Sequence, residues 1–403
     1  MRVPLSDRAI AAYLALAACA LYLLSGLGHP TVYDYDARLA VSITQGKWWV
    51  EEAPSWLSEL VPCGEGRWCV HLAPLPAILV LPFLTILRDG AAQTVASAIT
   101  GGLVAAPTFL TVRRLGAPRA LAIATTVFAI AGTTLWVNAS DGRAWYFAHA
   151  AAVLFASLAV LAALDGRPAW LVAGLLGIAG LARLPLFLAA PALAMLVWQQ
   201  RREPLLRVIA FGALGLAPFV AAQIGYNLLR WGVPYDAGYV RLNEVEPFYT
   251  QGLLSLGYIP RHLYAMLMQA PDFVDGTVFF VRPSWIGTSL VLVSPALAFA
   301  FVALGKWRER PEVPILALGA LLALLPDVTF AAVGFAQFGY RYIHDAQAFL
   351  IPLVAIGAGW RGVAPGASAA WQAPPWTLLA LIGWSVVANL YGMLALIHFD
   401  YVR

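Results

Sequence analysis

The sequence predicts an all-α polytopic membrane protein, because of its composition, the length of its apolar runs and their continuity. The 403 residues are 61% hydrophobic and 11% charged, whereas about 25% of the residues of soluble domains are charged. Apolar runs of about twenty residues recur along the chain, which is the length of helix that crosses a hydrocarbon layer of roughly 30 Å. Because these runs are continuously apolar and do not alternate with polar residues, they indicate helices and not a barrel.

About eleven transmembrane helices are expected in one membrane-embedded domain. The first, residues 9–28, has the hydrophobicity of a cleaved signal peptide. No convincing small-residue cleavage site follows it, so we expect it to be retained as a span. The domain then covers residues 1–403, and the further spans are expected at residues 91–112, 119–137, 144–164, 168–182, 186–199, 205–229, 285–304, 313–335, 346–360 and 375–397.

The positions of arginine and lysine predict which loops face the cytoplasm, because basic residues concentrate there. One alternating path fits them if the proline-rich residues 71–87 form an interfacial or re-entrant segment that does not cross. On this path the N-terminus is cytoplasmic, and residues 29–90 and 230–283 form two large extracytoplasmic loops of a multi-pass protein in the plasma or inner membrane. The expected cytoplasmic basic residues are Arg2, Arg8, Arg113, Arg114, Arg119, Arg167, Arg201, Arg202, Arg207, Lys306, Arg308, Arg310 and Arg361.

Two cysteines share the first expected outer loop, in the sequence CGEGRWC. An oxidising compartment allows Cys63 and Cys69 to form a small disulfide. His71 follows closely, so a zinc site is the alternative, but no fourth ligand is evident. We therefore expect a disulfide here and no resident metal.

A pair of aspartates stands where the chain leaves the first span, in the sequence YDYDARLAV. Asp34 and Asp36 alternate with tyrosines, and both can face one cavity only if the turn is extended or irregular. A single loop aspartate is ordinarily a solvated acid. The aromatic neighbours and the amphipathic segment that follows indicate instead an interfacial helix whose start points inward. A carboxylate placed there can act as a general base toward a hydroxyl group.

A second polar group of residues begins where the third span is expected to end, in the sequence NASDGRAWYFAHA. Asp141, Trp145 and His149 are spaced by four, so they form one stripe along the start of a helix. Asp141 either caps this helix or binds substrate. His149 is either a hydrogen-bonded core histidine or a substrate-binding residue.

Arginines beside aromatic residues complete the candidate site. Arg183 lies between strongly apolar segments, where an arginine costs roughly 2.5 to 3.5 kcal/mol on insertion scales unless it is paired or solvated. Guanidinium groups match phosphate oxygens in a forked geometry, and aromatic rings offer apolar faces to sugars. Anchoring at the membrane interface, or snorkelling, is the alternative interpretation. The candidate phosphate- and substrate-binding residues of this kind are Arg183, Tyr226, Arg230, Arg282, Tyr340 and Arg341.

The sequence lacks the motifs of several other function classes. It contains no nucleotide-binding glycine loop, no zinc-protease helix motif and no nucleophile elbow. Its formal net charge of +4 comes mostly from loop arginines and does not indicate a nucleic-acid partner. The unusual polar residues gather instead on the expected extracytoplasmic side.

The order of these features resembles the GT-C superfamily of polytopic glycosyltransferases, which includes the protein O-mannosyltransferases. The segments GRWCVHLAPLPAILVLPF, GRAWYFAHAAAVLF, GLLGIAGLARLPLFLAAP, YNLLRWGVPYDAGY and QFGYRYIHDAQAFL are similar to a bacterial group described as family-39-like or RgtA-like. The resemblance covers most of the chain from about residue 30 to about residue 355. It implies a GT-C fold with a large first outer loop.

The resemblance also implies a function and a distribution of roles. A polyprenyl-phosphate sugar would donate a hexosyl or pentosyl group to a hydroxyl of a glycan, lipid or protein of the cell envelope, with inversion. The base falls on Asp34, with Asp36 as its near rival, and Asp141 takes the second acidic position. Mannosyltransferases have adjacent Asp and Glu, whereas Tyr35 separates the two aspartates here. The resemblance implies no certain cofactor and is compatible with a divalent metal ion.

Two other function classes share some of these features. A transporter or flippase of a lipid-linked substrate also uses intramembrane arginine and broken helices. The spans show no internal repeat, and the polar residues fall on one side, which disfavours transport. A non-catalytic relative that binds membrane lipids is the other alternative.

Overall fold

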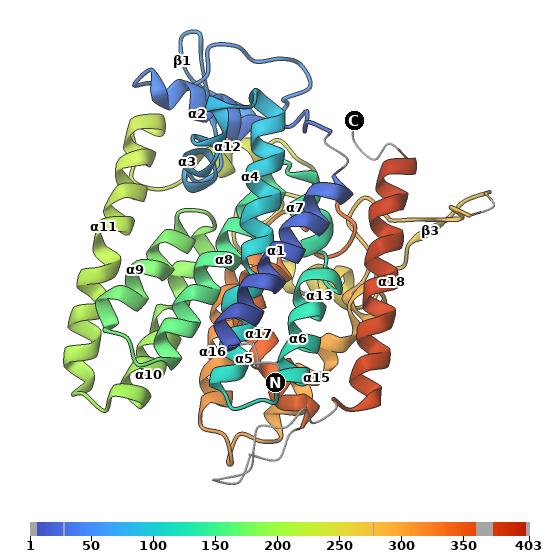
Figure 1. Ribbon diagram of the computed structural model, residues 1–403. Coiled ribbons are helices and arrows are strands. Elements are labelled where there is room, and N and C mark those ends of the chain that lie inside the picture. The colour runs from blue at the N-terminus through green and yellow to red at the C-terminus, as the bar shows by residue number, and fades with distance from the viewer. Residues whose placement is uncertain (1–5, 27–28, 277, 360–373, 400–403) are drawn as a thin grey trace.

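The computed structural model describes residues 6–26, 29–276, 278–359 and 374–399. The protein is mostly helical, and its long helices run side by side in one bundle (Figure 1). Arg2 and Arg361 lie outside the described residues, as do residues 27–28 and 360 at the ends of two expected spans.

The bundle is built from long helices and from shorter ones that complete it. The long helices are α1 (Asp7–Ser25), α4 (Asp89–Leu103), which continues into α5 (Ala105–Arg114), α8 (Ala144–Leu164), α11 (Leu205–Trp231) and α18 (Trp376–His398). The shorter ones are α6 (Arg119–Ala131), α7 (Leu135–Asp141), α9 (Ala169–Gly180), α10 (Ala190–Arg201), α14 (Leu290–Val293), α15 (Ala298–Leu304), α16 (Glu312–Val328) and α17 (Ile343–Ala358).

The connections contain short helices and two small hairpins. The helical pieces are α2 (Tyr35–Thr44), α3 (Leu75–Val80), α12 (Ala237–Asn243), α13 (Ile259–Leu267) and the 3-10 turns Phe83–Thr85, Leu184–Ala189, Leu256–Tyr258 and Pro295–Leu297. The antiparallel hairpins pair β1 (Leu60–Gly64) with β2 (Arg67–Val70), and β3 (Asp272–Phe273) with β4 (Val281–Arg282).

Within the described ranges, five helices are long and apolar enough to cross a membrane: α1, α4 with α5, α8, α11 and α18. The bent pair α6 and α7 makes a sixth if it is counted as one span. The expected helical membrane protein is therefore confirmed at this level. The larger number of spans stays a prediction.

Several expected spans correspond to helices that are shorter than about twenty residues. The α9 and α10 helices have 12 residues each, and α17 has 16. The chain between α9 and α10 turns at Arg183 and Pro185 into a 3-10 segment, because proline cannot donate a backbone hydrogen bond within a helix. This break allows a polar side chain, Arg183, to lie within the apolar bundle.

Residues 29–88 fold at one end of the bundle and form what we call the cap. It contains α2, the β1–β2 hairpin and α3 (Figure 1). The α3 helix is only 6 residues long, far too short to cross a membrane. It follows a proline and packs on α2 and α8.

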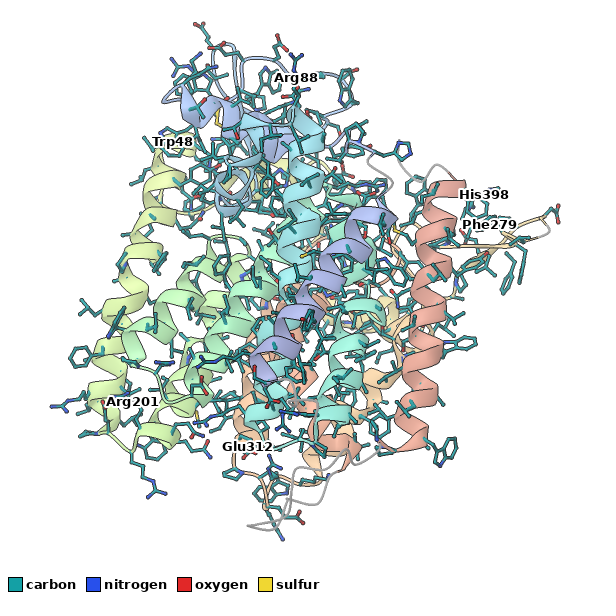
Figure 2. The ribbon with its side chains drawn as sticks, in the orientation of Figure 1. Trp48, Arg88, Arg201, Phe279, Glu312 and His398 are labelled. Carbon is teal, nitrogen blue, oxygen red and sulfur yellow. A yellow bond between two sulfur atoms is a disulfide. The ribbon has the colours of Figure 1, made fainter. Side chains whose placement is uncertain are left out.

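The opposite end of the bundle carries several of the expected cytoplasmic residues. Arg201 and Glu312 lie at the end away from Trp48 and Arg88 of the cap (Figure 2). The Asp7 carboxylate accepts hydrogen bonds from the Nε atoms of Arg113 and Arg119, at 2.8 and 2.7 Å. These contacts tie the start of α1 to the end of α5 and the start of α6.

Glycines let neighbouring helices approach closely, as is common between membrane helices. Gly357 of α17 is in contact with the backbone of α15, and a Cβ atom added there would overlap the carbonyl group of Phe299. We expect Gly357→Ala to lower the free energy of unfolding by about 1 to 3 kcal/mol, because α15 and α17 must move apart. Thermal unfolding in detergent measures this change.

The matched control is Gly212→Ala in α11, where an added Cβ atom meets nothing within 4 Å. Because alanine is a better helix former than glycine by about 1 kcal/mol, this variant should be neutral or slightly stabilised. Equal melting temperatures for the two variants would contradict the close packing of α15 on α17.

Candidate functional site

A cavity of about 890 Å³ is lined by several parts of the chain. These are the cap, α12, α13, the segment that follows α16 and the break between α9 and α10. Of the residues proposed from the sequence, Arg183 and Arg341 line it. It also contains charged residues that the sequence did not single out, among them Glu59 and Arg261. The ionisable lining residues are Glu59, His71, Arg183, Asp236, Tyr239, Glu246, Arg261, Asp327, Arg341 and Tyr342.

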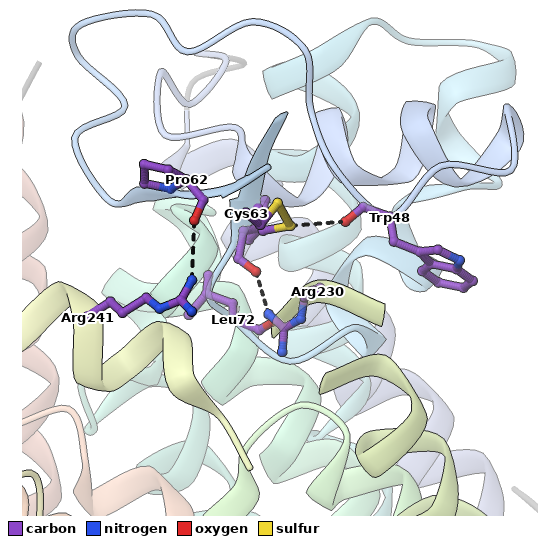
Figure 3. The surroundings of a disulfide bond; sticks show 8 residues. Trp48, Pro62, Cys63, Leu72, Arg230 and Arg241 are labelled. Carbon is purple, nitrogen blue, oxygen red and sulfur yellow. Dashed lines mark hydrogen bonds between the residues drawn. A yellow bond between two sulfur atoms is a disulfide. The ribbon is translucent and has the colours of Figure 1, made fainter. Parts of the chain in front are cut away.

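The β1–β2 hairpin brings Glu59 and His71 together, because Leu60 pairs with Val70 and the two polar residues are their outer neighbours. The expected disulfide between Cys63 and Cys69 is present and closes this hairpin (Figure 3). The Nε2 atom of His71 lies 3.7 Å from the Oε2 atom of Glu59, and its Nδ1 atom lies 3.1 Å from the Glu59 carbonyl oxygen.

Burial shifts the pKa values of this pair in opposite directions. It raises the pKa of Glu59 to about 7, an effect that the positive charge of Arg341 partly opposes. It lowers the pKa of His71 to about 4, so this imidazole is neutral at neutral pH. A carboxyl group with a pKa near the working pH in a cavity is a good general base.

The two aspartates predicted as the base do not line this cavity. Asp34 accepts a hydrogen bond from the Nε atom of Arg38 at 2.8 Å, and burial raises its pKa while Arg38 lowers it. Asp36 is fully buried, neither carboxylate oxygen has a hydrogen-bond partner among the described residues, and burial raises its pKa well above the usual value. Because both oxygens are inaccessible and lie outside the cavity, Asp36 is not in position to accept a proton from a hydroxyl bound there.

Tyr35, which separates the two aspartates, connects them to the cavity. Its hydroxyl oxygen accepts a hydrogen bond from the backbone N–H of Glu59 at 3.1 Å. Its ring lies 6.4 Å from that of Trp145, a lining residue. Tyr35 of the YDYD sequence therefore helps to hold the backbone of Glu59 in place.

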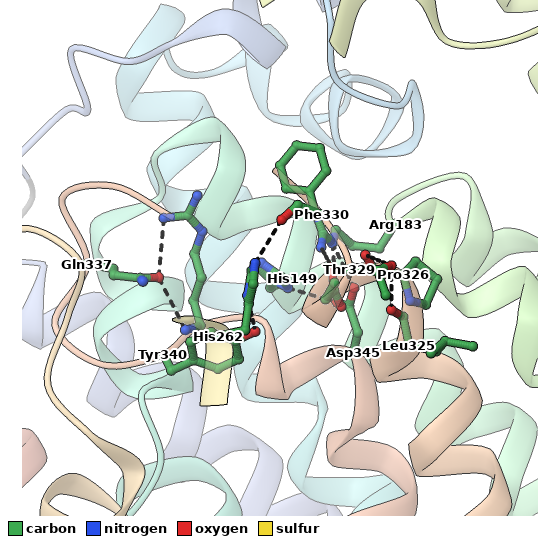
Figure 4. Close-up of polar contacts among 12 residues, drawn as sticks. His149, Arg183, His262, Leu325, Pro326, Thr329, Phe330, Gln337, Tyr340 and Asp345 are labelled. Atoms are coloured by element: carbon green, nitrogen blue, oxygen red, sulfur yellow. Dashed lines mark hydrogen bonds and ion pairs between the residues drawn. The ribbon is translucent and has the colours of Figure 1, made fainter. Parts of the chain in front are cut away.

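Arg183 lies in a buried cluster of charges (Figure 4). Its Nη2 atom is 2.7 Å from Asp327 Oδ1, and its Nε atom is 2.9 Å from Asp345 Oδ2. His149 Nδ1 is 2.9 Å from the other oxygen of Asp345. These partners offset the cost of an arginine between apolar segments. Because Arg183 already pairs with Asp327 and Asp345, its guanidinium group is poorly suited to bind a phosphate as well.

Arg261 and Arg341 are the lining arginines without a carboxylate partner among the described residues. Arg341 donates from Nη1 to the Phe335 carbonyl at 3.0 Å, and Arg261 donates to the Ala331 carbonyl. The two guanidinium groups thus bind the same loop, residues 331–335. Their charges make this part of the cavity suited to an anionic group such as phosphate.

The remaining predicted residues lie outside the large cavity. Arg230 donates to the carbonyls of Val70 and Leu72 and stacks on Tyr226 at 3.7 Å, so it fastens the cap to α11 (Figure 3). This contact explains Arg230 and Tyr226 as structural residues.

Tyr340, Arg282 and Asp141 also have partners of their own. The Tyr340 hydroxyl is 2.8 Å from His262 Nδ1, and Arg282 pairs with Asp272 across the β3–β4 hairpin at 3.3 Å. Asp141 pairs with the Nε atom of Arg143 at 2.8 Å and lines a separate cavity of about 310 Å³.

The carboxylate and imidazole groups of the described residues are not arranged to hold a divalent metal ion. Across the described part of the chain, no cluster of three or more His, Cys, Asp or Glu side chains could hold one. Asp34 and Asp141, the acidic positions implied by the resemblance, are each paired with an arginine. These residues do not fit a metal site, since such a site needs several carboxylate or imidazole ligands.

Comparison with known proteins adds information on the fold. No protein-family model matches the chain, and no curated protein matches it. Among solved structures it is similar to an oligosaccharyltransferase of Archaeoglobus fulgidus in the apo form, with a TM-score of 0.50 and 13% identity. The match covers 95% of this chain and 56% of that one, so the chain spans just over half of the length of that protein.

This similarity shows a GT-C-like fold and confirms that part of the resemblance read from the sequence. It does not bear on the protein O-mannosyltransferase or family-39-like subtype. At such low identity the likeness defines the architecture alone, and function has to be argued from the cavity.

Proposed function

We propose that the protein is a GT-C glycosyltransferase that transfers a hexosyl or pentosyl group from a polyprenyl-phosphate donor to a hydroxyl of a glycan, lipid or protein. The observation that carries this proposal is the combination, in one cavity, of Glu59 with a pKa of about 7 and two arginines without carboxylate partners. The cavity belongs to a GT-C-like membrane fold. A donor held in the membrane accounts for the absence of a nucleotide-binding motif in the sequence.

The proposed topology places this cavity on the extracytoplasmic face of the plasma or inner membrane. It keeps the cytoplasmic N-terminus and about eleven spans expected from the basic loops. The cap and α12 line the cavity at the end of the bundle away from Arg201.

In the proposed reaction, Arg261 and Arg341 hold the phosphate of the donor and stabilise the charge that develops on it. Glu59 accepts the proton of the acceptor hydroxyl, and the acceptor oxygen forms a bond to the anomeric carbon with inversion. The bond from that carbon to the phosphate oxygen breaks, and the phosphate leaves with the electron pair. His71 stays neutral and donates a hydrogen bond from Nδ1 to the Glu59 carbonyl oxygen, which holds the Glu59 backbone in place.

We propose Glu59 as the base in preference to Asp34. Glu59 lines the cavity that also contains Arg261 and Arg341, whereas Asp34 pairs with Arg38 and lies outside this cavity. In this proposal Asp34 and Asp36 have a structural role in the cap, and Tyr35 between them contacts the backbone of Glu59.

The function is tested with the full chain in nanodiscs and radiolabelled polyprenyl-phosphate hexoses and pentoses. We expect binding of the donor and transfer of label to a hydroxyl-bearing acceptor from the cell envelope. Arg261→Gln and Arg341→Gln should each weaken binding of polyprenyl phosphate roughly tenfold, since a hydrogen bond to a charged group contributes about 1.5 to 3 kcal/mol. Arg282→Gln, outside the cavity, is the control. Absence of both binding and transfer contradicts the proposal.

A further inference from the structure

A group of arginines lies at the end of the bundle away from the cap, where α8 connects to α9 and α10 connects to α11. The two connections contact each other, because the Nη1 atom of Arg201 donates a hydrogen bond to the Gly166 carbonyl at 2.8 Å. Figure 2 shows Arg201 at this corner of the molecule. Arg167 follows Gly166, Arg202 follows Arg201, and Arg207 lies in the first turn of α11. We call Arg167, Arg202 and Arg207 the arginine corner.

The acidic side chains of these two connections do not neutralise the arginine corner, because each pairs with a different arginine. Asp165 Oδ1 is 3.1 Å from Arg114 Nε, and Glu203 Oε1 accepts a hydrogen bond from Arg201 Nε at 2.6 Å. The three side chains of the corner are exposed, and among the described residues their guanidinium groups have no hydrogen bond or ion pair. Three positive charges are therefore available to an anion from outside the chain.

Two tryptophans indicate that the corner lies at the surface of the bilayer. Trp170 follows Arg167 by three residues in α9, and Trp198 precedes Arg202 by four residues in α10. Each ring thus lies within about one helical turn of an arginine, toward the middle of the bundle. The two side chains are 53% and 45% exposed. Because exposed tryptophans of membrane helices concentrate at the interface, the arginines beyond them lie at the level of the lipid headgroups.

An apolar surface for acyl chains adjoins the corner. The α11 helix is long and apolar enough to cross a membrane, and little of it is buried inside the protein. Its Leu206, Ile209 and Leu214 side chains are exposed. Gly215 packs directly on the backbone of Trp170, which keeps α11 beside α9 at this corner. A phospholipid can contact both the charges and this apolar surface, whereas a soluble anion can use only the charges.

We infer that the arginine corner binds the headgroup of an anionic phospholipid, whose acyl chains lie along α11. Guanidinium groups match phosphate oxygens in a forked geometry, and basic residues just outside membrane helices attract anionic lipids. The site is at the opposite end of the bundle from the cap. It goes beyond the proposed function and does not depend on it.

The test measures lipid binding to the full chain in detergent by native mass spectrometry. The two lipids are phosphatidylglycerol and phosphatidylcholine with identical acyl chains. We expect the unmodified protein to bind phosphatidylglycerol at least about tenfold more tightly. Arg167→Gln, Arg202→Gln and Arg207→Gln should each weaken this binding about fivefold, and the triple variant should lose the preference, since each basic residue near an anionic lipid surface contributes about that factor.

The matched control is Arg308→Gln, in the connection between α15 and α16 at the same end of the bundle. Arg308 is exposed and lies 4.9 Å from the Trp307 ring. Its replacement should leave the affinity for phosphatidylglycerol unchanged, and an equal loss would show diffuse attraction to any arginine at this end and overturn the site. Equal binding of the two lipids to the unmodified protein also overturns the inference. So does displacement of phosphatidylglycerol by glycerol phosphate at equal concentration, because the acyl chains would then contribute nothing.

Discussion

Replacement of Glu59 by glutamine is expected to lower the turnover of sugar transfer by roughly 10²- to 10⁴-fold, the range that a positioned general base contributes. Glutamine has nearly the same shape and cannot accept the proton of the acceptor hydroxyl. The hairpin, with its disulfide and the Tyr35 contact to the Glu59 backbone, does not depend on the carboxylate. Single-turnover transfer from a labelled donor measures the change, and donor affinity should stay the same.

The matched variant is Asp34→Asn, which changes the acid predicted from the sequence. We expect a small effect, since Asp34 contacts Arg38 and does not line the cavity. A large loss in Asp34→Asn together with normal turnover in Glu59→Gln would reverse the assignment of the base.

The pH dependence of transfer provides an independent readout for Glu59. A general base must be ionised, and the pKa of Glu59 is raised to about 7 by burial. Turnover should therefore be low below pH 6, rise through pH 7 and level off above pH 8, as a single titration of about one unit on either side of the pKa requires. In Glu59→Gln this rise should disappear from the residual rate. A profile that is flat between pH 6 and pH 8 in the unmodified protein would exclude Glu59 as the base.

The sequence predicted the helical membrane fold but not Glu59. The hydrocarbon layer itself requires an apolar composition and apolar runs of a given length, so both can be recognised in local stretches of the sequence. Glu59 lies in no recognisable motif. Its proposed role follows from the hairpin, which brings it next to His71. The expected disulfide offered a usable signal, because a bridge between Cys63 and Cys69 also brings together the residues that flank them.

The charged cluster shows a different limit of sequence reasoning. The sequence required a partner for Arg183, since an unpaired arginine between apolar segments is costly. The partners, Asp327 and Asp345, follow 144 and 162 residues later. Only the packing of the α9–α10 break against α16 and α17 brings them together.

Likewise, Arg230 beside Tyr226 had the appearance of a phosphate site, and its backbone partners in the cap could not be read from the local sequence.

Replacement of Arg183 by methionine is expected to lower the free energy of unfolding by about 3 to 5 kcal/mol, the usual cost of removing one partner from a buried ion pair. Methionine fills much of the same volume but leaves Asp327 and Asp345 close together without a cation. Their side chains are only 5% and 0% exposed, so water cannot replace the guanidinium group. Denaturant or thermal unfolding in detergent measures the loss.

Two further variants separate charge from packing in this cluster. Arg282→Met removes an arginine from an exposed pair with Asp272, and surface pairs contribute only about 0 to 1 kcal/mol, so little stability should be lost. Adding Asp345→Asn to Arg183→Met removes the carboxyl group that is left buried without its guanidinium partner, and part of the lost stability should return. If the double variant is no more stable than Arg183→Met, packing and not charge accounts for the loss. Arg183 would then hold the α9–α10 break through its shape alone.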